Sequence, residues 1–357
     1  MKQATDIRAT SWVPVWLWGA LGVVAALVIV AVWHGYDPAR STDSAGVATP
    51  AAVDASIIPA VAAAHSALPR PFPPGVTATA SALTVRDGAS VVGSASADGM
   101  VRVSVEGKQL ISVMAHHGLP VTAMAISSDG RTVLSGGGDS ELRVWDLQSG
   151  TERLNLRGHE HPITAVAVSA DGATFASAAQ ETRIMVWDAS TGKLIAVLSG
   201  HSDFVNDVAF ADEGRLASAG TDGKILVWDV GTGSIQRTLS GAGTAVSKLS
   251  FGAEGKTLVS GSEDGTVVIW NASTGREQHR LATHRATISA LALNANGTRL
   301  ATASTDNQVV LWDSSSGELL GSFAGPDASV ASLSFDATGN LLIGGSSGSL
   351  AQWNLGR

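Results

Sequence analysis

The stretch Leu142-Arg143-Val144-Trp145-Asp146 decides the fold of this chain, because close copies of it return at an almost constant spacing. The copies end on Trp-Asp or Trp-Asn pairs that start 41 or 42 residues apart, at positions 145, 187, 228, 270, 312 and 353. One step further back lies Val101-Arg102-Val103-Ser104-Val105, a degenerate copy in which Ser104 replaces the tryptophan. The chain therefore holds seven copies of one unit. A unit this short cannot bury its own apolar face, so successive copies must pack on one another.

Each unit also carries the pattern of four short strands. In the third unit, runs rich in β-forming residues fall at 163–168, 174–177, 183–188 and 194–198. Turn dipeptides such as Asp171-Gly172 separate these runs, and glycine supplies the positive φ that tight hairpin turns need. Every unit is therefore expected to form a four-stranded antiparallel sheet.

From about residue 76 to the C-terminus the chain resembles the WD-repeat β-propeller family, on the strength of the six Trp-Asp or Trp-Asn closures. The resemblance implies an all-β fold, a seven-bladed β-propeller of four-stranded antiparallel blades. It also implies a rigid platform for protein partners, and it rarely implies catalysis.

Composition excludes several kinds of function. The chain has no cysteine, so disulfides, thiolate metal sites and a cysteine nucleophile are excluded. The first 75 residues hold four basic and four acidic side chains, so the whole net charge of −8 belongs to the repeats. Affinity for nucleic acid needs clustered Lys and Arg, and we therefore expect no nucleic-acid partner.

An apolar segment precedes the repeats. Residues 13–33 carry no charge, and as a helix they would span about 31 Å, close to the thickness of the hydrocarbon core of a bilayer. Aromatic residues lie at both ends of the run, as expected at the two headgroup layers: Trp12, Trp16, Trp18, Trp33 and Tyr36. We expect a transmembrane helix that acts as an uncleaved signal-anchor. A cleaved secretory signal, whose apolar core is shorter, is the alternative.

The expected organisation has four parts: a short tail at 1–12, the transmembrane helix at 13–34, an Ala/Pro/Ser-rich tether at 35–75 and the propeller at 76–357. Lys2 and Arg8 precede the helix whereas only Arg40 follows it closely, which favours an inside N-terminus. The sequence thus predicts a single-pass protein of a bacterial inner membrane with a periplasmic propeller.

The chain ends directly after the third strand of its last unit, at Trp353-Asn354. Propellers avoid exposed sheet edges. We therefore expect a segment from residues 55 to 79 to pair onto the last blade as its outer strand.

In the resembling family, a histidine before the first strand, a Ser or Thr in the second, an acid in the following turn and the closing tryptophan form a buried hydrogen-bonded chain. The matching residues here are His117, Ser135, Asp139 and Trp145; His159, Ser177, Glu181 and Trp187; His201, Ser218, Asp222 and Trp228; and His284, Thr302, Asp306 and Trp312. The first, fifth and seventh units lack a member, with Ser104, Ala242 and Gly325 at the positions concerned.

Repetition of this set argues against a hydrolase triad, because an active site needs one asymmetric constellation. We therefore expect no catalytic residue and no cofactor. Among the clustered histidines only His116 and His161 are left unexplained. A metal site needs three or four converging ligands, so no metal site is expected.

In WD-repeat proteins, partners commonly dock near the starts of the innermost strands. The matching positions here are mostly small, except in the fourth unit, which has Phe204 and Asn206 beside Asp203. Aromatic anchors contribute much of the energy of protein interfaces, and these three residues are therefore the candidate partner-binding site. The alternative is that Phe204 packs against the neighbouring blade.

These features predict a non-catalytic, membrane-anchored scaffold for protein–protein interaction, with partners in the membrane or the periplasm. One alternative is an accessory structural subunit of one specific membrane complex. The other is an enzyme or small-ligand-binding propeller with a site in the central channel. Inner strands such as Ala-Val-Ala-Val at 165–168 argue against that reading, because a channel site needs inward-facing charged side chains.

Overall fold

The computed structural model describes residues 65–67, 78–86, 89–105, 112–115, 117–212, 214–242, 244–252, 254–326, 329–336, 338–346 and 350–355. All of them belong to one compact unit, Asp54–Arg357. The predicted tail at 1–12, the predicted transmembrane helix at 13–34 and the predicted tether as far as residue 64 lie outside the described residues. Within the described ranges, no helix is long and apolar enough to cross a membrane.

The described residues form seven four-stranded antiparallel sheets, which we number as blades 1 to 7. The strands of blades 1 to 4 are β2 (Ala78–Arg86), β3 (Ala89–Ser96), β4 (Met100–Val105), β5 (Ser112–Ala115); β6 (Val121–Ile126), β7 (Thr132–Gly137), β8 (Leu142–Asp146), β9 (Thr151–Leu156); β10 (Ile163–Val168), β11 (Thr174–Ala179), β12 (Arg183–Asp188), β13 (Leu194–Ser199); and β14 (Val205–Phe210), β15 (Arg215–Gly220), β16 (Lys224–Asp229), β17 (Ser234–Ser240). Those of blades 5 to 7 are β18 (Val246–Phe251), β19 (Thr257–Ser262), β20 (Val267–Asn271), β21 (Arg276–Leu281); β22 (Ile288–Leu293), β23 (Arg299–Ser304), β24 (Gln308–Asp313), β25 (Leu319–Ala324); and β26 (Val330–Phe335), β27 (Leu341–Gly345), β28 (Leu350–Trp353) and β1 (His65–Ala67).

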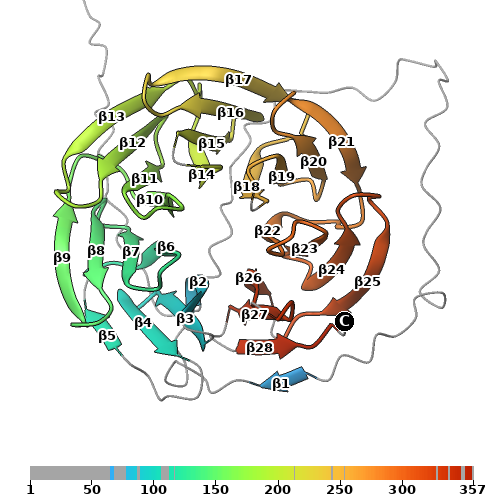
Figure 1. The fold of residues 1–357 in the computed structure, drawn as a ribbon, viewed down its shortest axis with the longest axis horizontal. Coiled ribbons are helices and arrows are strands. Elements are labelled where there is room, and N and C mark those ends of the chain that lie inside the picture. The colour runs from blue at the N-terminus through green and yellow to red at the C-terminus, as the bar shows by residue number, and fades with distance from the viewer. Residues whose placement is uncertain are drawn as a thin grey trace, which may run out of the picture. The chain divides into compact units, whose positions relative to one another are not determined.

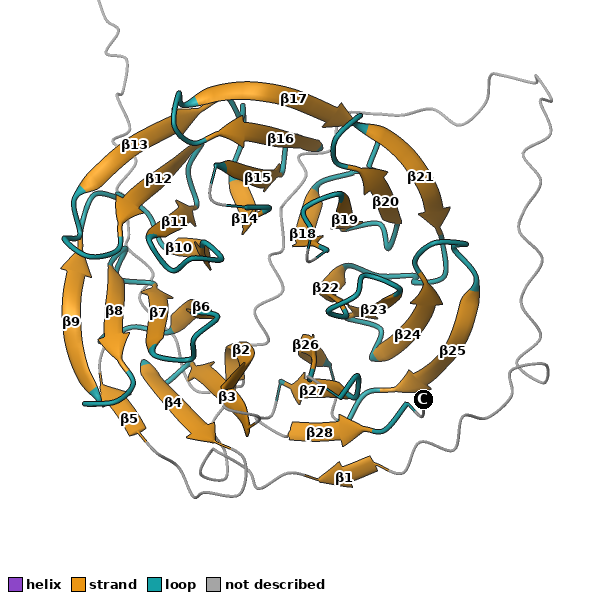
Figure 2. Ribbon diagram, viewed as in Figure 1, coloured by secondary structure: helices purple, strands orange, loops and turns teal. Residues whose placement is uncertain are grey.

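The blades are arranged in a ring, and the first strand of each blade lies nearest the centre (Figure 1). Only loops and turns connect the strands of the described residues (Figure 2). The all-β, seven-bladed architecture with four-stranded antiparallel blades is thus confirmed.

The core lies between neighbouring blades. For example, Leu134 and Leu142 of blade 2 pack in one buried cluster with Phe175 and Trp187 of blade 3. Second strands such as β15 are almost wholly buried, whereas outer strands such as β17 are mostly exposed. Each sheet thus buries both faces of its middle strands against its neighbours, which a single unit could not do.

The last blade is completed by a strand from the N-terminal part of the chain. β1 pairs antiparallel with β28, with His65 opposite Trp353 and Ala67 opposite Ala351. The strand order of this blade is β1-β28-β27-β26, so β1 covers the edge that β28 would otherwise expose. The prediction that a segment within residues 55 to 79 closes the ring is confirmed.

A second device joins the blades near the axis. A polar side chain next to the start of an innermost strand donates a hydrogen bond to the carbonyl oxygen of the first strand residue of the next blade. The pairs are Thr79–Val121, Thr122–Ile163, Thr164–Val205, Asn206–Val246, Ser247–Ile288 and Ser289–Val330. The equivalent position of blade 7 is Ala331, whose methyl group cannot donate. Six of the seven junctions therefore carry this bond, and the junction of blade 7 with blade 1 does not.

Deleting residues 55–75 is expected to lower the free energy of unfolding by about 1 to 3 kcal/mol, because the ladder hydrogen bonds of β1 are each worth about 0.5 to 1.5 kcal/mol. Urea denaturation of the full chain and of the deletion variant measures the difference. Deletion of residues 38–54, which leaves β1 in place, is the control. Equal stability of all three proteins would show that β1 adds nothing to ring closure.

Candidate functional site

Blade 4 contains a continuous chain of buried hydrogen bonds. Trp228 Nε1 lies 2.8 Å from Ser218 Oγ, which lies 2.7 Å from His201 Nε2. On the other side of the imidazole, His201 Nδ1 lies 3.0 Å from Asp222 Oδ1. Indole N–H can only donate, so the serine hydroxyl accepts from it and donates its own hydrogen to Nε2. The neutral histidine then carries its hydrogen on Nδ1 and donates to the carboxylate.

Burial determines the charge of this chain. Burial lowers the pKa of His201 below its ordinary value, and the neighbouring Asp222 carboxylate offsets only part of that effect. Burial alone would raise the pKa of Asp222, but the hydrogen bonds from the Ser202 N–H and from His201 outweigh it and lower that pKa. A neutral imidazole beside an ionised carboxylate matches the hydrogen-bond directions given above.

The structure brings the predicted sets of blades 2, 3 and 6 together in the same way. In blade 2 the three contacts measure 2.8, 2.8 and 2.9 Å. In blade 3, Trp187 and His159 both contact Ser177, and His159 contacts Glu181. In blade 6 the Trp312 and His284 contacts to Thr302 measure 3.1 and 2.8 Å, but His284 Nδ1 lies 3.5 Å from Asp306.

A glycine two residues before the acid explains these differences. A Cβ at Gly220 would lie 2.4 Å from His201 Nδ1 and 2.5 Å from Asp222 Oδ1, too close for real atoms. The position is glycine again in blade 2, but it is Ala179 in blade 3 and Ser304 in blade 6. Where a Cβ is present, the acid is either the longer glutamate or stands further from the histidine.

Blades 1, 5 and 7 lack the complete hydrogen-bonded chain of tryptophan, hydroxyl, histidine and acid, as their sequences predict. Blade 5 keeps the bond from Trp270 Nε1 to Ser260 Oγ at 2.9 Å but has Ala242 in place of the histidine. Blade 1 instead holds the buried Arg102, whose guanidinium lies 2.7 Å from the Asp98 carboxylate. In blade 7, Trp353 stacks on Phe323, with ring centroids 3.5 Å apart.

The predicted docking residues of blade 4 have different roles. Phe204 is 44% exposed, and its backbone carbonyl accepts a hydrogen bond from the Thr221 N–H at 2.9 Å. Asp203 is also exposed. Asn206 is only partly exposed, because its amide donates to the Val246 carbonyl and accepts from Thr221. Asn206 thus joins two blades, which leaves Phe204 and Asp203 as the residues available to a partner.

Two further exposed residues lie in equivalent loops, Leu119, which the sequence pattern does not single out, and His161, which it leaves unexplained. Leu119 precedes the first strand of blade 2 and is 52% exposed, more than Phe204. In blade 3 the same loop carries His161, whose side chain is 56% exposed; His116 lies outside the described residues. The position of Leu119, two residues after His117, is the signal that could have identified it.

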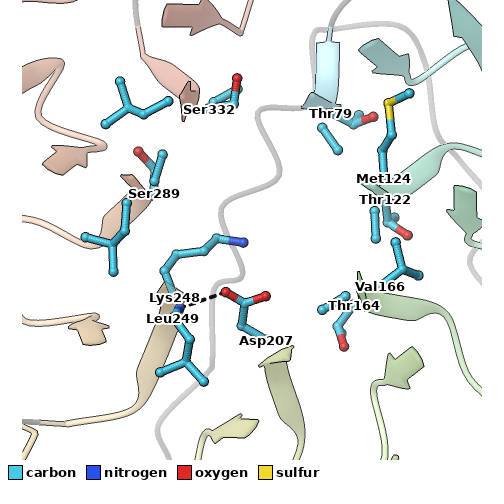
Figure 3. Close-up of a pocket in the computed structure, with 17 residues that line it drawn as sticks. Thr79, Thr122, Met124, Thr164, Val166, Asp207, Lys248, Leu249, Ser289 and Ser332 are labelled. Carbon is cyan, nitrogen blue, oxygen red and sulfur yellow. Dashed lines mark hydrogen bonds between the residues drawn. The ribbon is translucent and has the colours of Figure 1, made fainter. Parts of the chain in front are cut away.

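Two charged residues that the sequence pattern does not single out lie at the centre of the ring. Asp207 on β14 and Lys248 on β18 both line the cavity between the innermost strands (Figure 3). Their strands read Val-Asn-Asp-Val and Val-Ser-Lys-Leu, and this departure from the alanine-rich pattern of the other inner strands was a visible signal. Inward-facing charges are therefore present, contrary to the expectation drawn from the alanine-rich strands.

Part of the chain is similar to mammalian proteins named cilia- and flagella-associated protein 52. Over 79 residues, which are 22% of this chain, it is 37% identical to the Mus musculus protein and 38% identical to the Homo sapiens and Bos taurus proteins. The matched segment covers 13%, 13% and 12% of those proteins, so the chain spans only a small part of their length.

This comparison contradicts the predicted localisation in a bacterial inner membrane with a periplasmic propeller. The relatives are eukaryotic proteins named for cilia and flagella, and the described residues include no helix able to cross a membrane. The prediction relied on one apolar run and on a difference of one basic residue between its two ends, and neither observation identifies an organism or a compartment. The comparisons give no support for a membrane anchor or for periplasmic partners.

The family model described as WD domain, G-beta repeat matches six segments that together cover more than half of the chain, at residues 107–146, 150–188, 192–229, 233–271, 275–313 and 317–354. The matches contain the closing tryptophans of blades 2 to 7, and β2, β3 and β4 of the degenerate first blade lie before them. With repeats of this kind and seven four-stranded blades around one axis, the chain belongs to the WD-repeat family.

Proposed function

We propose that the chain is a non-catalytic scaffold that binds protein partners across the loops at the start of blades 2, 3 and 4. The main observation that supports this proposal is that Leu119 and Phe204, in equivalent loops of blades 2 and 4, are 52% and 44% exposed. Large apolar side chains in such positions act as anchors in protein interfaces. Membership of the WD-repeat family, whose propellers generally bind protein partners, supports the same conclusion.

The charges around these anchors indicate the chemistry of the partner. Asp203 beside Phe204 is exposed, whereas the 75% exposed Glu160 in the blade 3 loop lies 3.6 Å from the Arg183 guanidinium. Charged groups at the rim of an interface guide association and select partners of opposite charge. The expected partner therefore presents apolar side chains flanked by lysine or arginine.

The hydroxyl groups that stand beside histidines do not favour catalysis. Ser135, Ser177 and Ser218 are fully buried, and each is held between a histidine and a tryptophan in the same arrangement. A nucleophile must reach its substrate, and an active site is a single asymmetric arrangement. These serines instead support the blades that present the loops.

Replacing both Leu119 and Phe204 with alanine is expected to weaken partner binding at least about tenfold, because the few residues that dominate an interface each contribute about 2 kcal/mol or more. Affinity purification with the tagged full chain, followed by quantitative mass spectrometry, measures the recovery of each partner. Leu320→Ala is the matched control, because Leu320 is 40% exposed on the outer strand β25.

Undiminished recovery by the double variant, with melting temperatures equal to the wild type, would exclude this face. Recovery of one fixed set of proteins would favour a dedicated subunit of one complex. Several independent sets would favour a general adaptor.

A further inference from the structure

The innermost strands of all seven blades enclose a cavity of about 190 Å³ on the axis of the ring. Most of the residues that line the cavity are small. The third residue of each innermost strand shows this best. It is alanine in four blades, serine in blade 7, aspartate in blade 4 and lysine in blade 5: Ala80, Ala123, Ala165, Ala290, Ser332, Asp207 and Lys248. The repeat thus places a single acid and a single base in adjacent blades, at a register position that is otherwise occupied by small residues.

The carboxylate of Asp207 is held in a fixed orientation. Its Oδ2 accepts a hydrogen bond from the Leu249 N–H at 2.8 Å, and its Oδ1 accepts from the Val208 N–H at 3.0 Å. The Leu249 N–H belongs to the next blade, so this carboxylate bridges blades 4 and 5. Burial raises the pKa of Asp207, and the positive charge of Lys248 and the two N–H groups oppose that effect.

The ammonium group of Lys248 extends into the same cavity from β18 (Figure 3). Within the residues that the structure describes, Lys248 Nζ makes no hydrogen bond and no direct ion pair with Asp207. Asp207 and Lys248 are both partly exposed, and their opposite charges face one cavity without direct contact, so a group that carries both charges can pair with each of them.

The geometry points to a binding site for a small zwitterion with the chemistry of an α-amino acid, whose ammonium pairs with Asp207 and whose carboxylate pairs with Lys248. The size of the cavity supports a small ligand, since pockets for larger molecules are commonly about 300 to 1,000 Å³. A polyphosphate matches the site less well, because one base would face several negative charges and Asp207 would repel them. Val166 and Leu249 on the wall offer apolar surface to an apolar substituent.

The experiment titrates the full chain with individual proteinogenic amino acids and records both the melting temperature and saturation-transfer NMR signals of the ligand. At least one amino acid is expected to raise the melting temperature in a saturable way, since a ligand that binds only the folded state stabilises it. Its N-acetyl derivative lacks the ammonium and its amide lacks the carboxylate, so both are expected to bind at least about tenfold more weakly.

The variant Asp207→Ala/Lys248→Ala is the matched protein, because it gives blades 4 and 5 the residue that four other blades have at this position. It is expected to fold and to lose binding at least about tenfold. The proposal is overturned if no amino acid binds the wild type, if the acetyl and amide derivatives bind equally well, or if the double variant binds unchanged. The partner-binding loops are not altered by this variant, so the outcome is independent of the proposed scaffold function.

Discussion

Replacing Ser218 with alanine is expected to lower the free energy of unfolding by about 2 to 4 kcal/mol. Ser218 is fully buried, and its hydroxyl is the shared partner of Trp228 Nε1 and His201 Nε2. An alanine leaves both nitrogens without that partner, and each buried group left unsatisfied costs about 1 to 3 kcal/mol. This one substitution therefore removes the central member of the hydrogen-bonded chain Trp228–Ser218–His201–Asp222.

Guanidinium denaturation of the wild type and the variant measures this loss. Ser240→Ala is the matched control, because Ser240 lies on the outer strand β17 of the same blade and is exposed. We expect the control to stay within about 0.5 kcal/mol of the wild type. A similar loss in both variants would mean that the buried hydrogen bonds of Ser218 add no more to the free energy of unfolding than an exposed serine does.

Acidification between pH 7 and pH 5 is expected to destabilise the propeller through its buried histidines. Burial is the largest cause that lowers the pKa of each of them below the ordinary value of 6.5: His117, His159, His201 and His284. As the pH falls below about 6.5, the unfolded chain takes up protons that the folded chain still refuses. The contribution of these neutral histidines to the free energy of unfolding is therefore fully present above that pH. Below it the contribution is lost, by about 1.4 kcal/mol per pH unit for each histidine until its pKa in the folded protein is reached.

Urea denaturation at a series of pH values between 7.5 and about 5 gives the slope directly. Two acid members of these chains, Asp222 and Glu181, have lowered pKa values and affect stability only below about pH 5, so the two intervals are separate. His279→Gln is the control, because His279 lies on the outer strand β21 and contacts the Ser315 carbonyl instead of a member of the buried chains. A free energy of unfolding that does not change over this interval would contradict the neutral, buried state of the histidines.

Much of the architecture could be read from the sequence because it repeats. The tryptophan spacing predicts the number of blades, and the missing last strand predicts closure by the N-terminal segment that the structure shows as β1. The spacing also predicts which residues meet in the buried chains, since the same four positions return in each unit. It does not predict how well they meet, because that depends on whether Gly220 or a residue with a Cβ, such as Ala179, stands two positions before the acid.

The functional surfaces were harder to predict, because they depend on what does not repeat. Asn206 was expected on the docking face, but its amide joins blades 4 and 5. Leu119 was missed because the neighbouring position, occupied by Phe204 in blade 4, is proline in blade 2. The charges of Asp207 and Lys248 were missed because the inner strands were judged from blades where that position is alanine. A pattern taken from the average repeat hides the single exceptions on which the proposed sites depend.

Closure of the ring by β1 and β28 also sets the order in which the protein can fold. β1 is synthesised first among the described strands, yet its partner is the last strand of the chain. Pairing of segments so distant in sequence carries a large loop-closure entropy and is slow. The junction it must complete is also the one where Ala331 supplies no hydrogen bond to the next blade. Blades 2 to 6 can therefore form while the chain is still emerging from the ribosome, and the assembled propeller exists only after the final strand has been made.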